Sequence, residues 1–169
     1  MRKVLIFDTS ILCVMLEVPG KSICGPNDDR WDKPRVDKKI QEEEQAKTTF
    51  VLPLASIIET GNHIAQASHS RRDCAQRLAD LILKSVRQET PWAAFSEHTE
   101  LWSPVKLEHL AKNLPEMAVR KISLADTTIV HVAEYYAQMP CDVEILTGDR
   151  GLKACQPSQI SPMPRRRQV

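Results

Sequence analysis

The hydrophobic and polar positions of this 169-residue chain alternate between short apolar runs and longer segments with helical spacing. Three β-branched or aromatic runs, at residues 3–7, 48–54 and 142–146, predict strands that are buried in a parallel sheet. A further run at residues 90–95 predicts a short strand, which Pro91 restricts to a strand start or a sheet edge.

Apolar residues recur at helical spacing between these runs, and capping and breaking residues mark the ends of the segments. The predicted helices cover residues 10–18, 36–47, 57–64, 71–88, 105–114 and 124–136. Ser123 is a natural N-cap for the last of them, and Asp126 stands where a capping box places its acidic partner. Strands that alternate with helices in this way predict an α/β fold, a three-layer α/β/α sandwich with a central parallel sheet.

The pattern predicts one domain over residues 1–162, with an inserted loop and charged helix at about residues 20–47. Residues 21–33 are expected to form a loop, and the run Glu42-Glu43-Glu44 is expected to be a solvated helix face. Residues 160–162 are a candidate edge strand, and residues 163–169 form a basic tail.

The composition is that of a globular protein without a membrane span, with 42% hydrophobic and 27% charged residues. A formal net charge of +1 means that nucleic-acid contacts would need local basic patches rather than a basic surface throughout. The chain has an odd number of cysteines, and their spacing argues against a zinc site and a disulfide framework. The five are Cys13, Cys24, Cys74, Cys141 and Cys155. We therefore expect a cytoplasmic protein.

Four carboxylates stand where predicted strands end or where the following helices begin: Asp8, Glu59, Asp126 and Asp149. Each taken alone is also explained as a turn residue, a helix cap or a residue favoured by the helix dipole. Together they would lie at one edge of a parallel sheet, where chemistry collects in open α/β folds. Crowded carboxylates repel one another unless a cation neutralises them. Oxygen ligands without cysteine or histidine favour Mg²⁺ or Mn²⁺.

The residues around these acids resemble the four acidic signatures of PIN-domain nucleases, in the order of that family and over nearly the whole chain. The matching segments are Ile6-Phe7-Asp8-Thr9-Ser10, Ile58-Glu59, Leu124-Ala125-Asp126-Thr127 and Leu146-Thr147-Gly148-Asp149-Arg150-Gly151-Leu152. The first and the last are the most diagnostic, and the glutamate signature is short.

The resemblance implies a metal-dependent endoribonuclease that prefers single-stranded RNA, with Asp8, Glu59, Asp126 and Asp149 as ligands of Mg²⁺ or Mn²⁺. Ser10 would position Asp8 or the attacking water, and Thr147 would orient the last acidic loop. In-line hydrolysis would leave a 5′-phosphate and a 3′-hydroxyl. Many small bacterial members of the family, VapC-type toxins among them, are homodimers held inactive by an antitoxin, so these are the expected partners beside RNA.

The chain departs from the compact toxin pattern by the added segment around residues 22–47. It also has Thr127 and Thr128 where many relatives carry another acidic residue, which places more weight on Asp149. Two alternatives remain open. A phosphatase of the haloacid-dehalogenase type would need a second aspartate where this chain has Ser10, and a non-catalytic PIN-like scaffold would bind RNA or protein without cleaving it.

Overall fold

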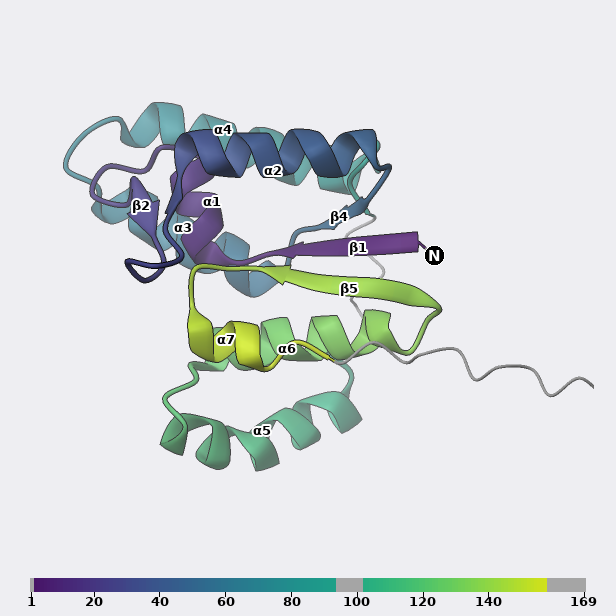
Figure 1. The fold of residues 1–169 in the computed structure, drawn as a ribbon. Helices are drawn as coiled ribbons and strands as arrows, with labels where there is room; N and C mark the ends of the chain where they lie inside the picture. Colours follow the sequence, from purple (N-terminus) through teal and green to yellow (C-terminus); the bar gives the residue numbers. More distant parts are fainter. Residues whose placement is uncertain (1, 94–101, 158–169) are drawn as a thin grey trace, which may run out of the picture.

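A three-stranded parallel sheet forms the centre of the molecule in the computed structural model, which describes residues 2–93 and 102–157 (Figure 1). Its strands are β1 (Arg2–Phe7), β4 (Thr49–Val51) and β5 (Cys141–Leu146), in the order β4-β1-β5. Since β1 pairs in parallel with both neighbours, the carboxyl ends of all three strands point to one edge of the sheet. The three principal strands predicted from the apolar runs are thereby confirmed.

The central strand β1 separates two hydrophobic cores, because its side chains alternate between the faces of the sheet. Leu5 and Phe7 belong to one cluster, and Val4 and Ile6 belong to the other. Their side chains are at most 1% exposed. A strand buried on both faces needs helices on both sides, which explains why its sequence is uniformly apolar rather than alternating.

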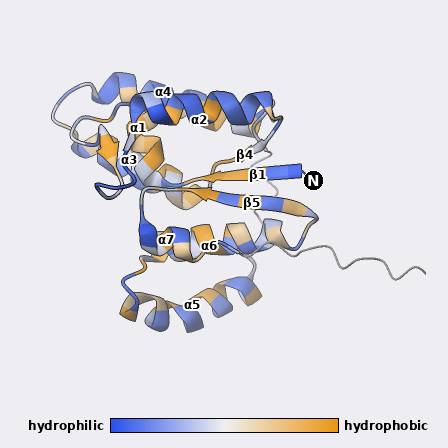
Figure 2. Ribbon diagram, viewed as in Figure 1, coloured by the Kyte–Doolittle hydropathy of each residue, from blue (hydrophilic) through white to orange (hydrophobic). Residues whose placement is uncertain are grey.

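Helices cover both faces, so the predicted three-layer α/β/α sandwich is confirmed (Figure 1). One face is covered by α1 (Thr9–Met15), α2 (Lys33–Gln45), α3 (Leu54–Gln66) and α4 (Arg71–Val86). The other carries α6 (Leu124–Ala137) and α7 (Arg150–Ala154), with α5 (Pro104–Val119) packed outside α6. In Figure 2 the carboxyl-terminal parts of β1 and β5 are hydrophobic, whereas α2 is mostly hydrophilic. Within the described residues, no helix is long and apolar enough to cross a membrane.

The inserted segment differs from the prediction of a plain loop. Residues 21–33 contain a small antiparallel hairpin made of β2 (Ile23–Cys24) and β3 (Trp31–Asp32). Strands of two residues are too short to produce an alternating pattern, which is why the turn-forming residues dominated the sequence signal. Asp32 then caps α2 by accepting a hydrogen bond from the Arg35 amide, so this helix begins three residues before the predicted start.

The expectation that Glu42-Glu43-Glu44 is wholly solvated is wrong for Glu43, which is buried. Its carboxylate accepts hydrogen bonds from Lys3, Lys39 and Thr48, so burial is compensated by charge pairing. The predicted strand at residues 90–95 is reduced in the described part to one parallel bridge between Trp92 and Phe50. The candidate edge strand at 160–162 and the basic tail at 163–169 lie outside the described residues.

Candidate active site

Asp8 directly follows the central strand and is the N-cap of α1, and its side chain is buried. Its Oδ1 accepts a 2.6 Å hydrogen bond from the Thr9 amide. Its Oδ2 accepts hydrogen bonds from two hydroxyls, Ser10 Oγ at 2.6 Å and Thr147 Oγ1 at 2.8 Å. The carboxylate is therefore held in one orientation by groups that follow two neighbouring strands.

Burial raises the pKa of Asp8 above its ordinary value, because the charged form is removed from water. The hydroxyls of Ser10 and Thr147 act in the opposite direction, and repulsion from the nearby charge of Asp126 raises the pKa further. The site thus favours either a proton on Asp8 or a cation beside it. Perturbed carboxylates at a strand exit are typical of functional sites.

The same two hydroxyls also hold the loop of residues 147–149, here called the acid loop. Thr147 Oγ1 accepts a 2.9 Å hydrogen bond from the Asp149 amide, and Ser10 Oγ accepts a 3.0 Å hydrogen bond from the Gly148 amide. Each hydroxyl therefore donates to Asp8 and accepts from the acid loop. The contacts of Ser10 with Asp8 and of Thr147 with the acid loop are therefore present, and the catalytic roles predicted for the two hydroxyls stay predictions.

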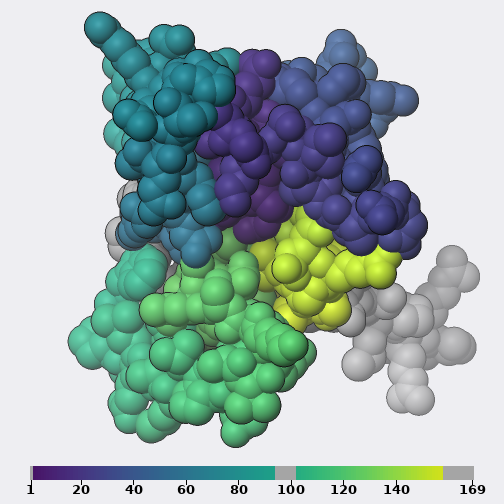
Figure 3. Space-filling view, turned by 90° about the vertical axis from the view of Figure 1, so that its left-hand side faces the viewer, coloured from purple at the N-terminus to yellow at the C-terminus, as the bar shows by residue number. Residues whose placement is uncertain are grey.

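Among the hydrogen bonds of the described residues, none joins Asp149 to Asp8. The Asp149 side chain is exposed and caps the short helix α7, since its Oδ1 accepts a 2.9 Å hydrogen bond from the Leu152 amide. The structure therefore places Asp149 at the same sheet edge but gives it a structural role as well. Figure 3 views this edge, where the yellow segment after β5 lies directly beneath the purple segment of α1.

Glu59 lies half-buried on the second turn of α3 and reaches the site through Thr9. Thr9 Oγ1 donates a 3.0 Å hydrogen bond to Glu59 Oε2. The start of α3 is fixed to the end of β1, because Ser56 Oγ donates a 2.8 Å hydrogen bond to the Phe7 carbonyl. The sequence pattern predicts no contact between Thr9 and Glu59, although Thr9 stands within the first acidic signature.

Asp126 completes the capping box of α6 that the sequence predicts. Its amide donates a 3.0 Å hydrogen bond to Ser123 Oγ, and its Oδ2 accepts from the Ser123 amide at 3.2 Å and from Ser123 Oγ at 2.8 Å. The helix-cap interpretation and the candidate-ligand interpretation of this residue are compatible, because capping occupies one carboxylate oxygen.

In three of the four acids, one carboxylate oxygen accepts hydrogen bonds from the protein. Among the described residues, Glu59 Oε1, Asp126 Oδ1 and Asp149 Oδ2 accept no hydrogen bond. In the same part of the chain, however, no three cysteine, histidine, aspartate or glutamate side chains stand in a geometry that could hold a metal ion. Asp8 contacts Ser10 and Thr147 directly and is close enough to Asp126 to feel its charge. Glu59 and Asp149 are each connected to Asp8 through one intermediate residue.

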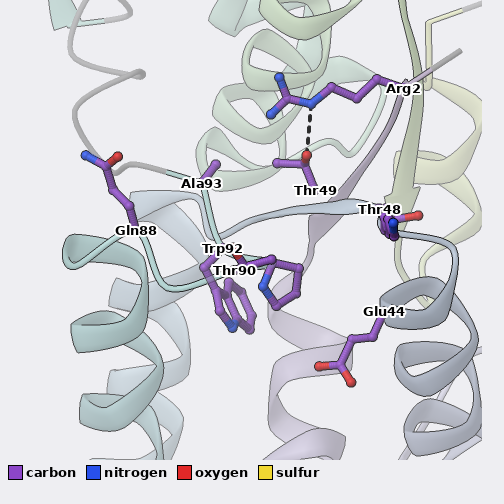
Figure 4. A pocket seen from close by; sticks show the side chains of 10 residues that line it. Arg2, Glu44, Thr48, Thr49, Gln88, Thr90, Trp92 and Ala93 are labelled. Atoms are coloured by element: carbon purple, nitrogen blue, oxygen red, sulfur yellow. Dashed lines mark hydrogen bonds between the residues drawn. The ribbon is translucent and has the colours of Figure 1, made fainter.

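A cavity of about 680 Å³ lies at the other end of the sheet, away from these acids (Figure 4). It is lined by residues at the amino ends of β1 and β4 and by Trp92, and Arg2 Nε donates to Thr49 Oγ1 beside it. Its lining contains none of the four candidate acids. The candidate chemistry therefore belongs to the carboxyl ends of the strands.

Comparisons with protein-family models, with curated proteins and with solved structures found no match for this chain.

Proposed function

We propose that the protein is a metal-dependent ribonuclease that hydrolyses phosphodiester bonds in single-stranded or structured RNA. The observation that carries the proposal is the environment of Asp8, a buried carboxylate with a raised pKa beside the charge of Asp126. A protein that keeps such a carboxylate at the exit of its central strand gains from it if a cation occupies the site. The resemblance of the surrounding residues to PIN-domain nucleases points to the same chemistry.

The donor set fits a hard divalent cation such as Mg²⁺ or Mn²⁺, since Asp8, Glu59, Asp126 and Asp149 supply only oxygen ligands. Three of these residues have an oxygen without a hydrogen bond among the described residues. When bound, the cation would neutralise the scissile phosphate and activate water. Glu59 is half-buried and Asp149 is exposed, so neither carboxylate is enclosed as that of Asp8 is.

The chain's own groups would orient this chemistry. The hydroxyls of Ser10 and Thr147 both donate to Oδ2 of Asp8 and so fix its carboxylate, and the same two hydroxyls accept from the amides of the acid loop. Preorganised carboxylates lower the cost of reorganisation when charge develops on the phosphate. Hydrolysis would proceed in line and leave a 5′-phosphate and a 3′-hydroxyl.

We also propose partners and a cellular compartment for the protein. RNA is the substrate, and an antitoxin protein and a second copy of the chain are the partners that the family resemblance suggests. Five cysteines that form no disulfide fit a reducing cytoplasm.

The decisive experiment is cleavage of a mixed RNA substrate with Mg²⁺ or Mn²⁺ by wild type and by the Asp8→Asn and Asp126→Asn variants. We expect each variant to lose at least about 100-fold in rate, as when a group that stabilises transition-state charge is removed. Asp80→Asn is the matched control, because Asp80 is exposed on α4 and, among the described residues, accepts a side-chain hydrogen bond from Gln76 alone. Wild-type cleavage by both site variants would exclude the proposed site.

A non-catalytic scaffold is the second candidate, and one observation favours it. Asp126 and Asp149 have helix-capping roles that explain their presence without any metal. Thermal unfolding with and without Mg²⁺ separates the two functions, because a ligand that binds only the folded state raises its stability. The nuclease is expected to be stabilised by the cation and the Asp8→Asn variant is not, whereas a scaffold shows no metal effect in either protein.

A further inference from the structure

The β2–β3 hairpin, here residues 23–32, packs directly on the acid loop. A Cβ atom placed on Gly148 would lie 2.7 Å from Cys24 Sγ and 2.7 Å from the amide nitrogen of Gly25. The φ angle of Gly148 is outside the left-handed region, so its backbone does not require glycine. What excludes a side chain at Gly148 is the hairpin itself.

Cys24 is the hairpin residue nearest to the site chemistry. Burial raises the pKa of its thiol, the Ser10 hydroxyl acts in the opposite direction, and the charge of Asp8 raises the pKa again. A neutral thiol therefore stands against the group that holds both Asp8 and the Gly148 amide. This describes a packing contact rather than a reactive nucleophile.

A second contact ties the far end of the hairpin to the residue after Asp149. Arg150 forms an ion pair with Asp28, in which one guanidinium nitrogen reaches both carboxylate oxygens. Both side chains are largely exposed, at 66% and 74%, so the pair adds little to global stability. Its effect is local, because it connects the hairpin turn to the start of α7.

The hairpin is itself anchored on α2. The guanidinium of Arg35 lies 3.8 Å from the ring centroid of Trp31, and it also donates to Asp29 Oδ1 at 2.7 Å and to the Arg30 carbonyl at 2.6 Å. In Figure 3 the dark blue segment of the hairpin adjoins the yellow segment that follows β5. A braced element therefore packs on the acid loop.

We propose that the β2–β3 hairpin is a positioning element of the acidic site, and that Cys24 and Asp28 are positioning residues that press the acid loop against Ser10. Only the catalytic consequence rests on the proposed function. Whether or not the protein cleaves RNA, the hairpin holds the Gly148 and Asp149 amides in their hydrogen bonds to Ser10 and Thr147.

Amide hydrogen exchange by NMR tests this on the full chain without requiring activity. We expect Asp28→Ala to accelerate exchange at the Gly148 and Asp149 amides by at least about 10-fold, while the unfolding midpoint changes little. Asp37→Ala is the matched control, because it removes another exposed ion pair, with Lys33, on the outside of α2. Unchanged exchange in Asp28→Ala, or equal acceleration in both variants, would overturn the proposal.

A second variant probes the glycine contact. Gly148→Ala is expected to accelerate exchange at the same amides, whereas Gly61→Ala on α3 is not, because a Cβ there meets nothing within 4 Å. Failure of Gly148→Ala to do so would also count against the hairpin contact. If wild type cleaves RNA, Asp28→Ala should require about 10-fold more Mg²⁺ for half-maximal rate. If wild type cleaves no RNA, the ribonuclease proposal fails and the exchange data still decide the role of the hairpin.

Discussion

Thr147 Oγ1 donates a 2.8 Å hydrogen bond to Oδ2 of Asp8, and this bond joins residues that are 139 positions apart in the chain. The two residues meet because β1 and β5 are neighbouring parallel strands whose ends coincide, with Phe7 opposite Leu146. The same hydroxyl accepts the Asp149 amide, so a single buried side chain connects the central acid to the last acidic loop.

Replacing Thr147 by valine should therefore disturb both sides of this connection. Thr147→Val keeps the shape of the side chain but leaves the Asp149 amide without its partner, and Oδ2 of Asp8 keeps only its hydrogen bonds from Ser10. We expect this to cost about 1 to 3 kcal/mol in the free energy of unfolding. The pKa of Asp8 should rise further, because the Thr147 hydroxyl lowers it in wild type. Urea unfolding and an NMR titration of Asp8 measure the two effects.

Thr128→Val is the control for this substitution. The Thr128 hydroxyl donates to the Ala125 carbonyl within its own helix, so its loss should change stability by less than about 0.5 kcal/mol. Equal destabilisation by both variants would mean that the hydrogen bond between Thr147 and Asp8 contributes no more to stability than the bond within the helix.

Asp8→Asn should change the pH dependence of stability in a defined direction. Because the pKa of Asp8 is raised on folding, the folded state holds this proton at pH values where the unfolded state has lost it. The free energy of unfolding is thus lowered as the pH rises above about 4, the ordinary pKa of an aspartate. Removing the charge should make the metal-free variant more stable than wild type near neutral pH, and the gain should shrink at acid pH. Thermal unfolding in the presence of a chelator measures this, and a variant less stable than wild type at neutral pH contradicts it.

The architecture and the cap of α6 could be predicted because each depends on neighbouring residues. The apolar run before Asp8 specifies a strand buried on both faces, and Ser123 with Asp126 specifies a capping box. Both are confirmed by contacts close in sequence or by regular pairing. The candidate acids could be placed at one sheet edge for the same reason, since parallel strands bring their ends together.

The rest depends on contacts between distant segments, which leave no periodic signal. Nothing in the run Glu42-Glu43-Glu44 distinguishes its middle member, which is buried where Lys3 of the central strand pairs with it. The packing of Cys24 on Gly148 likewise requires the hairpin to fold back over a loop more than a hundred residues later. Sequence reasoning therefore predicts which acids stand near the strand ends, but it cannot find the side chains from distant segments that contact them.

Glu43→Gln should destabilise the protein in a pH-dependent manner. Burial alone would raise the pKa of Glu43, but hydrogen bonds from Lys3, Lys39 and Thr48 lower it to about 2. A carboxyl with a lowered pKa in the folded state stabilises that state above its unfolded pKa, and the contribution is lost as the pH falls toward 2. At neutral pH we expect a loss of about 3 kcal/mol from breaking a buried charge pair, measured by urea unfolding.

The difference between wild type and Glu43→Gln should shrink between about pH 5 and about pH 2, where wild type loses the same interaction. Glu42→Gln is the matched control, because Glu42 is 60% exposed and its contact with Lys38 is 3.9 Å long. A control variant as unstable as Glu43→Gln would show that burial of Glu43 does not explain its effect.

Thr9 offers the most direct test of whether Glu59 belongs to the site. Thr9→Val removes the 3.0 Å hydrogen bond to Glu59 Oε2 while keeping the volume of a side chain that is only 6% exposed. Glu59 can then turn to solvent, so the free energy of unfolding should fall by no more than about 1 kcal/mol. If Glu59 helps to hold the cation, the metal concentration for half-maximal RNA cleavage should rise by about 10- to 100-fold, as expected when the partner of a ligand is lost.

Thr9→Ser keeps the hydroxyl and should retain the wild-type metal dependence. A valine variant with the metal dependence of wild type would remove Glu59 from the candidate ligands and leave Asp8 and Asp126 as the centre of the site.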